Sequence, residues 1–164
     1  MLNIIDILIT DRTASDVSRH AALARKSFAE MTAEEQLEWS TSMKGSYNAT
    51  DLNRVGQAIK YVENQLHAYG YTIHTTPKTD WTMDDIPTLE QLNHVIADVQ
   101  TCRNKLSLPS STPSVPVSME LFNYEKANDI EKILKQVYES LMKIVEGMIY
   151  FSGDMFCGEL YSTF

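Results

Sequence analysis

The same sequence pattern for the start of a helix occurs three times in this chain, and this repetition constrains the fold more than any other feature. The copies align on Asn53, Asn93 and Asn128. Five positions before each Asn lies a residue that caps helices well: Asn48, Thr88 and Asn123. Small or apolar residues recur one position before the Asn and two and six positions after it: Leu52, Val55 and Ile59, then Leu92, Val95 and Val99, then Ala127, Ile130 and Leu134. This agreement indicates three related helical units.

Apolar residues three and four apart extend each unit into a helix. The first stripe runs from Leu52 to Tyr69 and predicts a helix that ends at Gly70. The second helix begins after Thr88, whose side chain is expected to form a capping box with Gln91, and it stops before Pro109. The third stripe consists of Ile130, Ile133, Leu134, Val137, Leu141, Ile144, Val145 and Met148, and helical spacing is lost after about Tyr150.

Charged residues on the third helix predict its solvent face. Glu131, Lys135, Glu139 and Lys143 are spaced four apart, as in pairs of opposite charge on an exposed helix surface. A fourth copy of the unit is an open alternative, with Thr13 as its cap and Ser18 in the Asn position. Thr32 and Glu35 predict the capping box of a further short helix.

The fold class predicted is mainly α, a bundle built from three or four related units. It carries an extended N-terminal arm over 1–10, a helical domain over 11–106, a Pro- and Ser-rich connector over 107–118, a long helix over 119–150 and an aromatic tail over 151–164. A turn signal at Ser152–Asp154 predicts a short β-hairpin in that tail, and Tyr71–Thr75 could form a short strand. Whether the units close into a bundle or stack as a short solenoid is left open.

Composition argues against several classes of partner. The net charge is −8, and the 14 Lys and Arg residues are scattered, so we expect no binding to nucleic acid or to an anionic membrane. No apolar run approaches the roughly 18 residues that span a bilayer, and the N-terminus lacks the basic region of a signal peptide. Cys102 and Cys157 have no partner at metal or redox spacing, so two reduced thiols are expected, and a disulfide between them is the alternative.

Motifs for catalysis and for metal or cofactor binding are missing from the sequence, so we expect no catalytic residue, no metal and no cofactor. The four His residues form no pair at metal-ligand spacing, and there is no Gly-rich phosphate loop. Asp80, Asp84 and Asp85 are the densest acidic group. The interpretation favoured for them is structural, with Asp84 and Asp85 near a helix start and Trp81 anchoring the loop. An acid–base or cation site is the alternative.

The repeated Asn and the chain ends are the remaining candidates for a specific role. We expect each Asn to be half-buried and to hydrogen-bond the loop of a neighbouring unit, against the alternative of an inherited surface residue. The tail holds more apolar surface than a free terminus should expose, so it folds back or meets a partner. The residues predicted to bind partners are Ile4, Ile5, Ile7, Trp81, Tyr150, Phe151, Phe156 and Tyr161.

Several stretches together resemble a family of small structural proteins from the tail and baseplate region of tailed phages and prophages of Gram-positive bacteria. They are DRTASDV, MTAEEQLEW, MKGSYNATDLNRV, PKTDWTMDDIPT, ELFNYEKANDIEKIL and YFSGDMFCGEL, in this order over nearly the whole chain. The resemblance implies a non-enzymatic virion protein, made in the host cytoplasm and placed in the tail. It implies other tail or baseplate proteins as partners, and the symmetry of such assemblies favours a homo-oligomer. A module that binds the host surface, using Trp81 and the tail aromatics, is the alternative.

Overall fold

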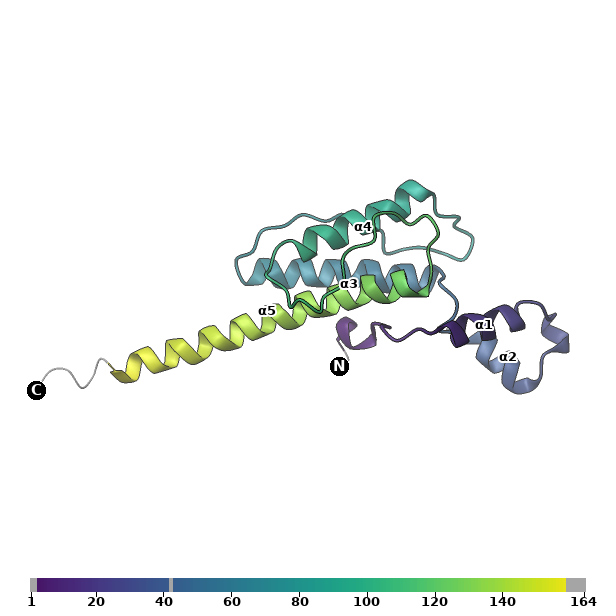
Figure 1. Cartoon of the computed structure of the whole chain (residues 1–164), viewed down its shortest axis with the longest axis horizontal. Coiled ribbons are helices and arrows are strands. Elements are labelled where there is room, and N and C mark those ends of the chain that lie inside the picture. The colour runs from purple at the N-terminus through teal and green to yellow at the C-terminus, as the bar shows by residue number, and fades with distance from the viewer. Residues whose placement is uncertain (1–2, 42, 159–164) are drawn as a thin grey trace, which may run out of the picture.

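The computed structural model describes residues 3–41 and 43–158, and within these ranges the chain is helical with no strand. The elements are η1 (Ile4–Ile7), α1 (Ala14–Leu23), η2 (Phe28–Glu30), α2 (Ala33–Ser40), α3 (Ala49–Ala68), α4 (Leu89–Arg103) and α5 (Tyr124–Gly158). Figure 1 shows α3, α4 and α5 packed side by side, α1 and α2 as a lobe at one end, and α5 running far beyond the other end. The prediction of a helical bundle is confirmed.

The three bundle helices run in the same direction, because a long extended segment returns the chain to the starting end after α3 and again after α4 (Figure 1). Gly70 ends the first helix with a φ of 84°, a left-handed conformation that favours glycine. Polar caps set the helix starts. The side chains of Asn48 and Thr88 accept hydrogen bonds from Thr50 N and Gln91 N, and that of Asn123 accepts one from Lys126 N.

One apolar core joins the three helices. It consists of Val55, Ala58, Ile59, Val62 and Leu66 of α3, Val95, Ile96, Val99 and Cys102 of α4, and Ile130, Ile133, Leu134, Val137 and Leu141 of α5. Ile5 of η1 and Leu8, Ile73 and Met119 of the connecting segments close this core. The predicted helical domain and the predicted long helix therefore share one core, with the connector 107–118 running between them.

Gly56 shows how closely the extended segments approach the helices. A Cβ atom at this position would collide with the backbone carbonyl oxygen of Lys78, in the segment that follows α3. A helix-interior glycine costs stability relative to alanine, roughly 1 kcal/mol. Here it allows the backbone of the segment to lie directly on α3.

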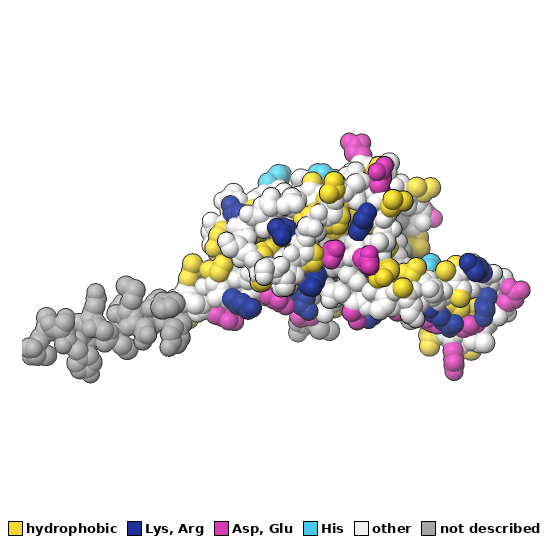
Figure 2. Space-filling view, in the orientation of Figure 1, with side chains coloured by type: hydrophobic (Ala, Val, Ile, Leu, Met, Phe, Trp, Pro, Cys, Tyr) yellow, Lys and Arg dark blue, Asp and Glu magenta, His cyan; other side chains and the backbone are white. Residues whose placement is uncertain are grey.

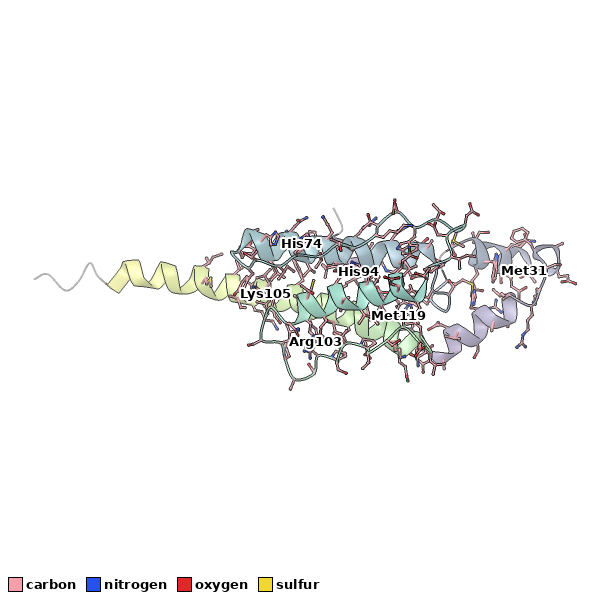
Figure 3. All side chains as sticks on the ribbon, turned by 90° about the horizontal axis from the view of Figure 1, so that it is seen from above. Met31, His74, His94, Arg103, Lys105 and Met119 are labelled. Carbon is pink, nitrogen blue, oxygen red and sulfur yellow. The ribbon has the colours of Figure 1, made fainter. Side chains whose placement is uncertain are left out.

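The lobe of α1 and α2 combines polar contacts with the buried apolar side chains of Leu23 and Met31. Arg19 pairs with Glu38 at 2.8 Å and Lys26 pairs with Glu35 at 2.8 Å, while His20 stacks on Trp39 with ring centroids 5.4 Å apart. Thr13 caps α1 and Thr32 caps α2, as predicted, and the capping box predicted for Thr32 is also found at Thr13, with Asp16. Figure 3 shows Met31 at this end of the molecule, away from the bundle core.

Two predictions about the chain ends are wrong in part. The tail was predicted to form a β-hairpin, but α5 continues as a helix to Gly158, through the turn signal at Ser152–Asp154. A two-stranded hairpin is marginally stable alone, whereas each residue added to an existing helix gains a backbone hydrogen bond. Residues 159–164, including Tyr161, lie outside the described residues.

The N-terminal segment was predicted to be an extended arm, but it folds as η1 and packs on the bundle. Ile5 is 3% exposed and belongs to the core, Ile4 packs against it, and Ile7 is 47% exposed. Tyr71–Thr75 forms no strand, because this part of the chain pairs with helix side chains and not with another strand.

Candidate functional site

The three repeated Asn side chains, called the docking asparagines below, each bind the backbone of an extended segment. Asn53 accepts a hydrogen bond from Trp81 N at 2.7 Å and donates one to Trp81 O at 2.8 Å. Asn128 makes the same two bonds with Arg12, at 3.0 and 2.9 Å. Asn93 accepts one from Met119 N at 2.9 Å. Each docking asparagine therefore holds one point of the loop that passes it.

These contacts link the three helical units in a closed ring. Asn53 on α3 holds the segment that leads into α4, and Asn93 on α4 holds the segment that leads into α5. Asn128 on α5 holds the N-terminal segment, which leads through the lobe to α3. Because the last unit contacts the first, the repeat forms a closed bundle and not an open solenoid.

The segments held by Asn53 and Asn128 also share a sequence motif that lies outside the repeated helix starts. Thr10–Thr13 reads TDRT and Thr79–Thr82 reads TDWT. In each, the backbone N–H of the second Thr donates a hydrogen bond to the carboxylate of an Asp three residues later, with an N–O distance of 2.8 Å. Thr13 is therefore both the N-cap of α1 and the counterpart of Thr82 in this loop motif. Ser18, the proposed fourth Asn position, is exposed on α1.

Four charged side chains are buried together beside the Asn128 contact. Glu131, fully buried, lies 2.7 Å from Arg12 and 2.9 Å from Arg54, and Arg12 lies 3.0 Å from Asp51. Arg54 also bonds Asp51. Burial alone would lower the pKa of Arg54, but its hydrogen bonds to Glu131 and Asp51 outweigh burial and raise the pKa.

The predicted exposed face of α5 is therefore wrong at Glu131, which points into the bundle. Its second carboxylate oxygen accepts a hydrogen bond from Ile9 N at 2.6 Å, so the cluster also fixes the N-terminal segment. The sequence signal that could have located it is the position of Glu131 immediately after Ile130 and three residues before Leu134, both of them buried. Since every carboxylate of this cluster is paired with an arginine, the cluster has a structural role: it holds the N-terminal segment, α3 and α5 together.

A pocket of about 350 Å³ lies between the Trp81 segment and α4. Its lining includes Trp81, Lys78 and His94, and Figure 3 shows His94 near the middle of the bundle. Trp81 is 6% exposed, with the Lys78 Nζ atom 4.1 Å from the centre of its ring. Its indole N–H has no hydrogen-bond partner among the described residues. Trp81 therefore anchors the loop and presents little surface to a ligand.

Asp98 lies behind this pocket with one oxygen bonded to Thr76 N at 3.3 Å and the other 3.8 Å from His94 Nε2. Burial raises the pKa of the Asp98 carboxyl. His94 Nε2 is also 2.7 Å from the hydroxyl of Thr76. A single carboxyl with a raised pKa, without a neighbouring nucleophile, does not assemble a catalytic group.

The acidic group predicted as an alternative site does not converge. Asp85 bonds the backbone N–H of Thr82, which lowers the pKa of Asp85, while Asp80 and Asp84 are exposed. No group of three potential metal ligands occurs among the described residues. Burial raises the pKa of the Cys102 thiol to about 12, so this thiol is a poor nucleophile at neutral pH.

The far end of α5 exposes apolar side chains, whereas the part of the helix before it buries them. Leu141 is fully buried, whereas Met148 is 63% exposed two turns later. Figure 2 shows hydrophobic side chains gathered where α5 leaves the bundle. Tyr150, Phe151 and Phe156 belong to this part of the helix, but their side chains lie outside the described part of the structure.

No family model, curated protein or solved structure matches this chain. Among the helices described, none combines the length and the apolar character that a membrane crossing requires.

Proposed function

We propose that the protein is a non-enzymatic structural subunit of a phage or prophage-derived tail or baseplate, and that it acts by protein–protein assembly. The observation that carries the proposal is the extension of α5 beyond the bundle with Met148 largely exposed. Apolar surface on a projecting helix is costly in water unless another protein covers it. The resemblance of the sequence to tail and baseplate proteins supplies the kind of assembly.

The closed bundle supports the same role. Three docking asparagines, a buried charge cluster and a single apolar core make a body in which the described polar groups stabilise the fold. In this proposal the body is a rigid platform and α5 is the element that contacts other tail proteins. The protein is placed in the virion tail after synthesis in the host cytoplasm.

A truncation tests this proposal. Removing residues 150–164 leaves the core intact, because the last core residue of α5 is Leu141. The truncated chain should unfold at the temperature of the full chain but be missing from purified particles. Lys143→Ala, on an exposed position of the same helix, should be incorporated normally. Normal incorporation of the truncated chain would contradict the assembly role of α5.

A second candidate is a host-surface binding module, and the pocket lined by Lys78, Trp81 and His94 is the observation that favours it. In this case the purified protein should bind host cell walls, and His94→Ala, which changes the pocket lining, should weaken that binding. Equal binding by both proteins, or none by either, would argue against a ligand in this pocket.

A further inference from the structure

The apolar stripe of α5 is longer than the surface that covers it. We define this stripe by residues alternately three and four apart, the spacing of a coiled coil: Ala127, Ile130, Leu134, Val137, Leu141, Ile144, Met148, Phe151 and Met155. The first five are at most 1% exposed, covered by α3, α4 and η1. Ile144 is half-buried and Met148 is 63% exposed. The pattern therefore continues past the point where the described residues cover it.

The uncovered part is long enough to pair with another helix. The residues after Leu141, here called the projecting half of α5, end at Gly158. At 1.5 Å per residue they extend about 25 Å. Among the described elements, Figure 1 shows none beside the end of this helix.

Charges in the projecting half avoid the stripe. In the coiled-coil register its flanking positions are Val145, Gly147, Ser152 and Asp154, so a single charge borders the stripe. Lys143 and Glu146 are exposed and occupy outer positions. Flanks of one sign would select a partner of the opposite sign, but nearly neutral flanks let identical helices approach without repulsion. This charge pattern favours another copy of the same chain as the occupant.

Gly147 is an independent observation at the same place. A glycine inside a helix lowers its stability relative to alanine. A Cβ atom at Gly147 would meet nothing within 4 Å, so packing among the described residues gives no reason for the glycine. Beside an apolar stripe, a missing side chain lets the backbone of a second helix come close.

We propose that the projecting half of α5 pairs with the same helix of a second copy of this chain, with Ile144 and Met148 in the contact and Gly147 beside it. The inference rests on the proposed function, because it names the partner of the surface assigned there to assembly. In the pair, each helix covers the apolar stripe of the other.

The mass of the full chain in solution tests the pairing. Sedimentation equilibrium should give at least twice the monomer mass of 18.6 kDa. Met148→Glu places a charge in the contact and should weaken association by on the order of 100-fold. Lys143→Glu introduces the same side chain on the outer face and should leave the mass unchanged. Circular dichroism melts should show an intact bundle in both variants, since neither position belongs to the core.

The outcomes separate this inference from the proposed function. A monomeric wild-type chain, or an oligomer that Met148→Glu leaves intact, overturns the pairing. If the wild type is monomeric and Met148→Glu is still lost from particles, α5 binds a different tail protein and only the pairing fails. If Met148→Glu abolishes the oligomer but enters particles normally, the pairing stands and the proposed role of α5 in assembly fails.

Discussion

The two halves of α5 carry the same apolar spacing in different surroundings. In the half up to Leu141, called the covered half, the stripe is buried against α3 and α4 and Glu131 binds two arginines. In the projecting half, Met148 is mostly exposed and Gly147 has open space around it. The difference teaches that hydrophobic periodicity predicts a helix face that needs a partner, but does not say whether that partner is in the same chain.

The largest expected effect lies in the covered half. Glu131→Ala removes the carboxylate that binds both Arg12 and Arg54, and it leaves buried positive charge uncompensated. We expect a loss of about 3–5 kcal/mol in the free energy of unfolding, measured by urea denaturation. Glu139→Ala, on the exposed face of the same helix, serves as the control and should change stability little. Similar losses in the two variants would show that the cluster does not hold the bundle.

Two glycines provide the same substitution in covered and uncovered surroundings. Gly56→Ala forces a Cβ atom against the Lys78 backbone and should destabilise the fold by about 1–3 kcal/mol. Gly147→Ala should raise the helix content of a monomeric background such as Met148→Glu, with a gain of up to about 1 kcal/mol. In the wild-type background it should weaken self-association. Stability changes of the same sign at Gly56 and Gly147 in thermal melts would remove the contrast between a covered and an uncovered glycine.

The docking asparagines should contribute unequally. Asn53→Ala removes two hydrogen bonds to Trp81 and leaves its backbone groups unpaired, for an expected loss of about 1–3 kcal/mol. Asn93→Ala should cost less, since Asn93 accepts one bond from Met119. Gln57→Ala, exposed on α3, is the matched control. A melt of Asn53→Ala that coincides with the wild type would return the repeated Asn to the status of an inherited surface residue.

The smallest expected effect concerns pH. Burial raises the folded-state pKa of Asp98 above the unfolded value, so the stability it contributes is present at low pH and lost as pH rises through the folded pKa. Asp98→Asn should therefore stabilise the protein at pH 7 by up to about 1 kcal/mol. The gain should vanish below the pKa of an unfolded Asp, about 4. Urea denaturation at pH 7 and below pH about 4 measures the sign of the stability change. Asp84→Asn, at an exposed position, is the control.

The sequence predicted the bundle helices well because their starts depend on local chemistry. A cap five positions before each Asn and an apolar stripe behind it are enough to locate α3, α4 and α5. The end of α5 was not predictable in the same way. Ser152–Asp154 is a turn signal, but helix continuation from Tyr150 overrides it.

Non-local pairing explains what the sequence did not reveal. Arg12 and Glu131 are 119 positions apart in the sequence, so no short-range spacing pattern indicates their ion pair. The partner of each docking asparagine likewise lies in a loop between 26 and 116 positions away. The repeat predicted that these Asn side chains share an environment, and the structure supplies the loop backbone that they bind.

The most direct test is hydrogen exchange along α5 as a function of protein concentration. Amides between Ala127 and Leu141 should be protected equally at all concentrations, because the bundle covers them within one chain. Amides of the projecting half should become more protected as concentration rises, because a second copy covers them. Protection of the projecting half that does not change with concentration, in a chain whose covered half is stable, would contradict pairing through α5.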